Sequence, residues 1–251
     1  MNDLISSNAH LPSTNAAIDL SQYAKQSLEA EKSTASGKFI SCRAGILSID
    51  SQPLPGNKMD VIILSTIHEN SYYSGKYDPT KHKSPVCYAY SSVGGPTMAP
   101  HELVKVPQAE LCSLCPHNVF GSADNGVGKA CKNTRRIAMI AAPFATSEDI
   151  LTAEVRYMRL PVTSAKGYSL YSKKIAALYN MPPFGIITTI APKPDFKSQF
   201  LITFKEAELV SAEMIPSVIQ RHNEQEHLIT FPYMEVEPEQ LISQPSKNSK
   251  Y

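Results

Sequence analysis

The sequence predicts a mainly β fold with some α-helix, and three observations support this class. Several segments concentrate or alternate β-branched and aromatic residues over the length of a strand. One long segment, between the fourth and fifth of these strands, has the apolar spacing of a helix. A stretch with four of the five cysteines interrupts the strands. In this order the elements favour a small Greek-key barrel of the OB type with an insertion and one or two flanking helices, and an open α+β sheet is the alternative.

The N-terminal part divides into an arm and a first pair of strands. Residues 1–37 are rich in Ser, Asn, Ala and Thr, which predicts a mobile arm. Residues 39–49 predict a strand with a break at Gly45, and the β-branched residues 59–70 predict a second strand. A cluster of turn residues at 53–57 joins the two, so we expect a hairpin.

The remaining elements follow an insertion at about residues 71–133, which includes a short strand over 86–90. The core as a whole is expected to span 38–234, followed by a loose tail at 235–251. After the insertion the sequence predicts strands over 136–142, 153–160, 185–190 and 199–204, a helix over 163–179 that ends before Pro182-Pro183, and a last helix over 211–227.

Cysteine spacing is the strongest chemical signal in the sequence. Cys112 and Cys115 form a Cys-x-x-Cys pair, and Cys87 and Cys131 lie on either side of it. Two intervening residues let both sulfurs of the pair face one ion, and four thiolates suit tetrahedral Zn²⁺. We therefore predict a structural zinc held by these four residues, while Cys42 is expected to be a buried strand residue. Two alternatives are open: the thiols are simply buried, or a histidine replaces Cys87. The candidate histidines are His82, His101 and His117.

Charge is distributed unevenly, although the net charge is only +1. Residues 71–140 contain eight Lys or Arg and four Asp or Glu, whereas residues 205–251 contain four and eight. Basic residues neutralise phosphates and aromatic rings stack on unpaired bases, so the first region predicts a surface for single-stranded nucleic acid. The alternative is that its tyrosines pack the insertion and its lysines only face solvent. The predicted contact residues are Tyr72, Tyr73, Lys76, Tyr77, Tyr88, Lys129, Lys132, Arg135 and Arg136.

Three enzyme classes that share features with this sequence are disfavoured. Zinc deaminases use His-x-Glu and Pro-Cys-x-x-Cys, whereas here His101 and Glu102 are adjacent and Leu111 precedes the cysteine pair. A P-loop requires Ser or Thr after Gly-Lys, and this chain has Ala130 there. Magnesium-dependent nucleases need clustered carboxylates, but the Asp and Glu residues are scattered. We therefore expect a non-enzymatic protein.

Size and hydropathy set the remaining expectations. A chain of 251 residues with 42% hydrophobic residues is long enough for one sizeable core. No apolar run approaches the roughly 18 residues that a membrane helix needs, so we expect a soluble protein without a membrane partner.

Several motifs together resemble a family of tailed-phage proteins found among replication genes. The resemblance covers roughly residues 38–234, and its most specific part is the core from the cysteine pair to Arg136. Its motifs are Tyr73-Ser74-Gly75-Lys76-Tyr77-Asp78-Pro79, Pro85-Val86-Cys87, the segment from Cys112 to Ser122, the segment from Gly128 to Arg136, Pro182-Pro183-Phe184, and Gln199 to Phe204.

The same architecture is similar to phage single-stranded DNA-binding proteins that carry a structural zinc. This resemblance implies an OB-like core, a zinc-bearing insertion and a place in the cytoplasm of an infected bacterial cell. In those proteins an acidic C-terminal segment contacts replication partners. Here the region from Glu206 to Glu239 is acidic, but Lys247 and Lys250 follow it.

The sequence therefore predicts a bacteriophage protein that coats single-stranded DNA through a basic and aromatic groove braced by zinc. Phage replication proteins are its expected partners, through the acidic C-terminal region. The alternative is a zinc-ribbon interaction module that binds or inhibits a host or replication protein.

Overall fold

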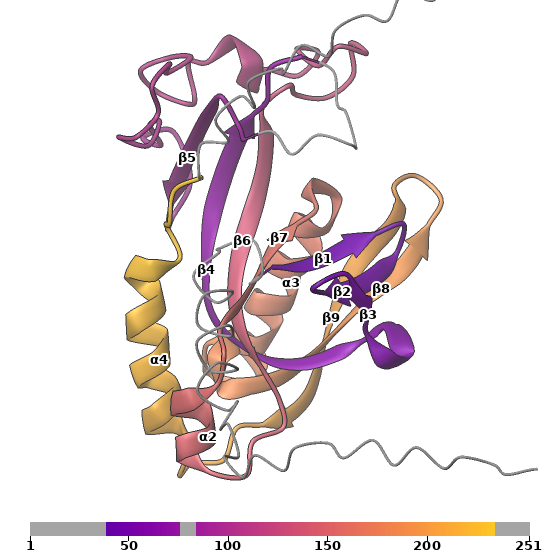
Figure 1. Ribbon diagram of the computed structural model, residues 1–251, viewed down its shortest axis with the longest axis vertical. Coiled ribbons are helices and arrows are strands. Elements are labelled where there is room, and N and C mark those ends of the chain that lie inside the picture. The colour runs from indigo at the N-terminus through magenta and orange to yellow at the C-terminus, as the bar shows by residue number, and fades with distance from the viewer. Residues whose placement is uncertain (1–38, 76–83, 234–251) are drawn as a thin grey trace, which may run out of the picture. The chain divides into compact units, whose positions relative to one another are not determined.

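A six-stranded antiparallel sheet forms the centre of the fold (Figure 1). The computed structural model describes residues 39–75 and 84–233, which belong to the larger unit of the chain. The strands pair in the order β7-β6-β4-β8-β9, and β5 pairs with the free edge of β4. Their bounds are β4 Met59–Tyr72, β5 Cys87–Ser91, β6 Lys132–Ala141, β7 Arg156–Leu160, β8 Ile186–Asp195 and β9 Gln199–Leu209.

Strand β4 is the central element because both faces of the sheet are covered there. Val61 and Ile63 belong to one apolar cluster, and Ile62 and Leu64 belong to another on the opposite face. All four side chains are buried, as expected for a strand between two layers, where a continuous apolar run replaces alternation.

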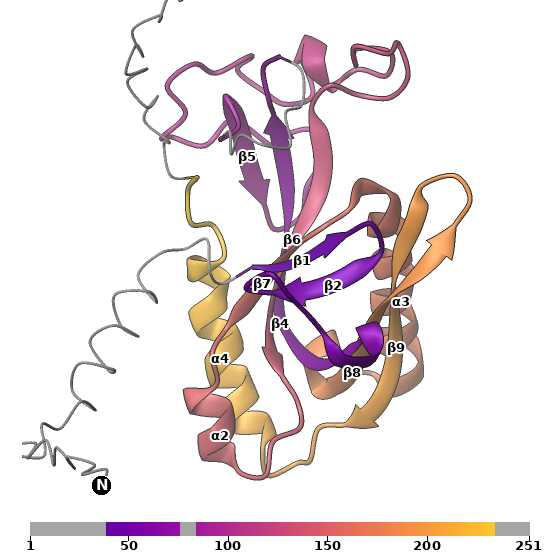
Figure 2. The ribbon, with the colours of Figure 1, turned by 45° about the vertical axis from the view of Figure 1, so that its right-hand side comes forward.

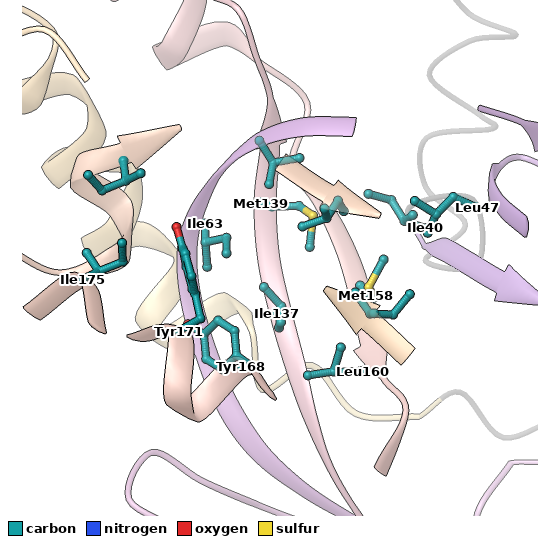
Figure 3. Packing of buried hydrophobic residues seen from close by; sticks show 14 residues of the cluster. Ile40, Leu47, Ile63, Ile137, Met139, Met158, Leu160, Tyr168, Tyr171 and Ile175 are labelled. Atoms are coloured by element: carbon teal, nitrogen blue, oxygen red, sulfur yellow. The ribbon is translucent and has the colours of Figure 1, made fainter. Parts of the chain in front are cut away.

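One face carries α3 (Val162–Tyr179) and a small sheet of β1 (Ile40–Arg43), β2 (Ile46–Ile49) and β3 (Gln52–Pro53). Figure 3 shows Tyr168, Tyr171 and Ile175 of the helix on one side of the sheet residues Ile63 and Ile137. Ile40 and Leu47 of the small sheet complete the same cluster. Each fully buried side chain of this kind contributes about 1.5–3 kcal/mol to stability.

The opposite face carries α2 (Ser147–Thr152) and α4 (Ile215–Leu228), which contact each other (Figure 2). Ile150 and Val218 are fully buried there against Ile62 and Ile140. Helix α2 begins at a capping box, in which Thr146 and Asp149 each bond the other's backbone N–H.

The mainly β class with helices is confirmed, but the sheet is not a closed barrel. Strands β7 and β9 are the two ends of its pairing order, and no pairing within the described residues joins them. A barrel fills its interior with its own side chains, whereas here separate layers cover both faces of an open sheet. The alternative of an open α+β sheet fits this arrangement.

Several local expectations were also wrong. Ala44 and Gly45 have positive φ and form a tight turn, so residues 39–49 make the hairpin β1–β2 and not one strand. Strand β4 pairs with β5, β6 and β8, not with β1. The last helix, α4, begins at Ile215 and not at residue 211, and Pro216 lies in its first turn, where a missing N–H costs nothing.

The predicted N-terminal arm, the predicted tail 235–251 and residue 234 at the end of the predicted core lie outside the described residues, as do Lys76, Tyr77 and His82 of the insertion.

Candidate metal centre and basic groove

The insertion between β4 and β6 lies at one end of the sheet (Figure 2). Strands β5 and β6 pair with opposite edges of β4 near its C-terminal end, where Tyr72 pairs with Cys87 and Ser71 pairs with Lys132. Cys87 begins β5, and Cys131 immediately precedes β6. Strand pairing therefore brings these two cysteines to the same end of β4, although 43 residues separate them in the sequence.

Backbone hydrogen bonds hold the Cys-x-x-Cys segment against these strands. The Cys112 N–H donates to the Met98 carbonyl over 2.8 Å, and the Cys131 N–H donates to the His117 carbonyl over 2.7 Å. Cys115 precedes the short 3₁₀ turn Pro116–Asn118, whose last N–H donates back to the Cys115 carbonyl. These hydrogen bonds hold Cys112, Cys115 and Cys131 at the end of the sheet where Cys87 begins β5.

All four cysteines line one cavity of about 20 Å³. This volume holds about one water-sized sphere, so it suits a single atom or ion and not a substrate. The four residues are 7–8% exposed, and their sulfurs are not joined in disulfides. Cys42, the fifth cysteine, is instead half-buried on β1 beside the main apolar cluster.

Burial shifts the acidity of the thiols. It raises the pKa of Cys87 and Cys112, and it raises the pKa of Cys131 to about 12. The neighbouring thiols raise these pKa values further, because several thiolates in one cavity repel one another. A soft divalent cation would compensate this charge, since Zn²⁺ binds thiolate and displaces the proton.

The donor type and number fit zinc. Within the residues that the structure describes, however, no group of three or more His, Cys, Asp or Glu side chains is already arranged as a metal site. The two described histidines that were alternatives to Cys87 do not line the cavity. The His117 ring stacks on Tyr72 with centroids 3.9 Å apart, and the His101 ring stacks on Tyr88.

A groove of about 530 Å³ lies beside this centre. Its described lining residues include two cationic side chains and several amide and hydroxyl groups, but no Asp or Glu. The polar lining residues come from β4, β6, α3 and the segment from Cys112 to Cys131, called the cysteine segment. They are His68, Asn70, Ser113, Asn118, Asn133, Thr134, Arg135, Lys166 and Ser169.

Arg135 is the central cation of this groove. It is half-buried, its guanidinium lies over the Tyr168 ring at 5.6 Å, and it donates to the Ser169 hydroxyl over 3.4 Å. Among the described residues no ion pair involves Arg135. A half-buried guanidinium without a carboxylate has a favourable site for an external anion beside it.

His68 pairs with Arg135 across the two strands. Burial and the Arg135 charge lower the pKa of His68 below its ordinary value of 6.5. Gly94 approaches this ring so closely that an added Cβ would lie 3.0 Å from it, and Gly94 has φ of +67°. Glycine is therefore the residue that both the backbone and the space require there.

Arg136 does not belong to this surface, which corrects its predicted role. Its side chain is 0% exposed and forms an ion pair with the equally buried Glu69 over 3.0 Å. It also donates to the carbonyls of Ile229 and Phe231 and to the Tyr90 hydroxyl. Successive strand residues point to opposite faces, so Arg135 faces the groove while Arg136 faces the interior.

The predicted stacking tyrosines are also used within the protein. Tyr88 is 5% exposed, Tyr72 is covered by the His117 ring, and the Tyr73 hydroxyl accepts from Arg159 over 2.8 Å. Of the predicted lysines, Lys132 is exposed and donates to the Lys129 carbonyl, and Lys129 donates to the Asn118 side chain over 3.1 Å.

Four residues that line the groove were not predicted from the sequence: His68, Asn70, Asn133 and Lys166. A signal existed for the strand residues: His68 and Asn70 are two apart on β4, and Asn133 and Arg135 are two apart on β6. Polar residues at this spacing at the end of an apolar strand share one face. Lys166 had no such signal, because only the docking of α3 brings it to the groove.

No protein-family model, curated protein or solved structure matches the chain. Within the described residues, none of the helices has the length and hydropathy that crossing a membrane requires.

Proposed function

We propose that the protein binds single-stranded DNA without catalysing a reaction, and that the groove around Arg135 is the binding site. The observation that carries this proposal is a half-buried guanidinium that none of the described carboxylates pairs with, in a groove whose described lining residues include no Asp or Glu. Phosphate oxygens would accept from Arg135 and Lys166. The Asn70 and Asn133 side chains, which bond each other, would offer their remaining donors and acceptors to sugars and bases.

The groove is large enough for a nucleotide unit and not only for a single small anion. Its volume of about 530 Å³ lies within the range of sites that hold a ligand as large as a nucleotide. Cys112 and Asn118 line both the groove and the thiol cavity, so one wall of the groove belongs to the cysteine centre.

A structural zinc held by Cys87, Cys112, Cys115 and Cys131 is part of the proposal. With four protein ligands it would leave no open position for water activation, and it would fix the groove wall instead. The resemblance to tailed-phage proteins supports a role in phage DNA replication in the cytoplasm of an infected bacterium, with phage replication proteins as partners. In this proposal the open sheet takes the part that the sequence assigned to an OB-type core.

The test is a fluorescence-anisotropy titration of zinc-loaded protein with a labelled unstructured oligonucleotide and with the matching duplex, over several salt concentrations. Arg135→Gln and Lys166→Gln are each expected to weaken single-strand binding about tenfold and to reduce the salt slope by about 0.7. The matched control is Lys173→Gln, which removes the same charge from an exposed position on α3 that does not line the groove.

Two results would reject the site. One is wild-type protein that binds neither oligonucleotide, and the other is an equal effect of Lys173→Gln and Lys166→Gln. The second result would show that only the overall charge matters.

A protein-interaction module is the second candidate, and exposed apolar side chains on the insertion favour it. Leu114 is 70% exposed, and Leu103, Val106, Val119 and Val127 are also exposed. Exposed apolar side chains are typical of a protein interface where they form one contiguous patch. Binding driven by apolar burial has a shallow salt slope, so the titration above separates the two candidates.

A further inference from the structure

Phe120 is the most exposed aromatic residue near the groove. Among the described aromatic side chains, only Phe120 (79%), Phe196 (92%) and Tyr179 (36%) are exposed. Phe120 lies in the cysteine segment, between the 3₁₀ turn Pro116–Asn118 and the loop that leads to Cys131. A single exposed phenylalanine is common on protein surfaces, so its surroundings decide whether it marks a site.

A fixed loop holds Phe120 in place. The Gly121 N–H donates to the Gly128 carbonyl over 2.7 Å, which closes the loop immediately after Phe120. The Ser122 hydroxyl donates to the His117 carbonyl over 2.9 Å and accepts from the Ala130 N–H over 3.0 Å. The ring is therefore presented from a segment tied at both ends to the cysteine centre.

A cation accompanies the ring and links it to the groove. The Lys129 ammonium lies 5.3 Å from the centre of the Phe120 ring and donates to the Asn118 side chain over 3.1 Å. Asn118 in turn donates to the Cys112 carbonyl over 2.7 Å, and both residues line the groove. Lys129 and Asn118 thus connect the exposed Phe120 ring to one wall of the Arg135 groove.

We propose that Phe120 stacks on a base of single-stranded nucleic acid that is bound in the Arg135 groove, while Lys129 contacts the neighbouring phosphate. This inference rests on the proposed function and deepens it. Every base has a face that can stack on an aromatic ring, but in a duplex these faces are already stacked on neighbouring pairs. Phe120 would therefore distinguish single strands from duplex, which the cations of the groove alone cannot do.

The chain offers a matched control on another element. Phe196 is more exposed than Phe120 and also has a lysine nearby, Lys197, at 5.5 Å from its ring centre. It lies at the end of the β8–β9 hairpin, which Figure 1 shows as a separate projection from the insertion, and it does not line the groove. Each position therefore has an exposed phenylalanine with a lysine near its ring, but Phe196 lies on a different element from the cysteine segment.

The sequence contains no tryptophan, so a substituted one reports from a single position. Phe120→Trp and Phe196→Trp are prepared as zinc-loaded full-length proteins and titrated with an unlabelled oligonucleotide and with duplex. Stacking predicts that the fluorescence of Phe120→Trp is quenched by the single strand and unchanged by duplex. The fluorescence of Phe196→Trp is expected to stay constant with both.

A second pair of variants measures the contribution to affinity. Phe120→Ala is expected to weaken single-strand binding about tenfold with an unchanged salt slope, and to leave duplex binding as it was. Phe196→Ala is expected to bind as the wild type does. Lys129→Gln, in contrast, is expected to reduce the slope by about 0.7.

The outcomes separate this inference from the proposed function. If the wild type binds single strands but Phe120→Trp is not quenched and Phe120→Ala binds normally, the stacking role is refuted and the groove assignment stands. If the wild type binds no single strand, both fail, and Phe120 would then belong to a protein interface.

Discussion

Substituting Arg136 tests whether this residue stabilises the interior of the protein, in contrast to Arg135, which lines the groove. Arg136→Met keeps much of the side-chain volume and removes the charge. The structure predicts that this variant loses stability, whereas Arg135→Gln, one residue earlier, loses binding. Arg136 is 0% exposed and its ion pair with Glu69 is fully buried, so no water replaces the lost contacts.

The magnitude follows from the partners that the guanidinium leaves behind. Glu69 loses a contact of 3.0 Å, and the carbonyls of Ile229 and Phe231 lose donors at 3.0 and 2.9 Å. Removing one member of a buried ion pair costs about 3–5 kcal/mol, because the other charge remains buried. Glu69 keeps its contact with Arg159 at 3.1 Å, which favours the lower end of that range.

The assay is urea unfolding of zinc-loaded protein, followed by circular dichroism. Arg136→Met is expected to lower the free energy of unfolding by about 3 kcal/mol. Arg135→Gln is expected to lower it by less than about 1 kcal/mol, since the Arg135 side chain is partly exposed and forms no ion pair with any described residue. At urea concentrations where Arg136→Met is folded, its affinity for the oligonucleotide should equal that of the wild type. A stable Arg136→Met with weakened binding would contradict the buried placement and return Arg136 to the DNA-contact set.

Two further predictions concern the metal centre and pH. Cys115→Ser is expected to reduce the zinc content of the purified protein from about one ion per chain and to lower its melting temperature. Cys42→Ser is expected to leave the zinc content and the melting temperature unchanged, because Cys42 does not line the cavity. Equal zinc content in the two variants would exclude the four-cysteine site. The pKa of His68 is lowered in the folded protein, so the unfolded state binds the proton more readily. The free energy of unfolding is therefore expected to decrease as the pH falls below about 6.5, the ordinary pKa of histidine. This decrease ends once the pH is below the pKa of His68 in the folded protein. Urea midpoints measured at pH 7.5 and 5.5 should differ less in His68→Gln than in the wild type, and an equal difference would refute the contribution of His68.

Local sequence patterns predicted most of the strands and the long helix. The β-branched run of β4 and the apolar spacing of α3 are strong because they depend on residues that are neighbours in the sequence. The pairing of the strands with one another was predicted less well. The tight turn at Ala44–Gly45 directs β1 back onto β2, and β4 finds its partners far along the chain. Which strands pair, and whether a sheet closes, depends on how the helices cover its faces.

The residues of the candidate site were likewise only partly predictable from the sequence. Spacing selected the four cysteines that line one cavity, because a Cys-x-x-Cys pair is a local signal. Composition identified a basic region of the sequence. It could not show which of its basic side chains are exposed and which are buried, since Arg135 and Arg136 are the same residue type. The orientation of β6 sends one guanidinium to the groove and the other to Glu69.

Thus the sequence by itself determined most of the strands of the large sheet, the long helix α3 and the cysteines that are candidates for a metal site. Only the tertiary structure decided which tyrosines pack inside the protein, which arginine pairs with none of the described carboxylates and which aromatic ring of the cysteine-bearing insertion, Phe120, stays exposed. The physical reason is that burial and charge pairing depend on residues brought from distant segments, such as Ile229 and Phe231 on Arg136.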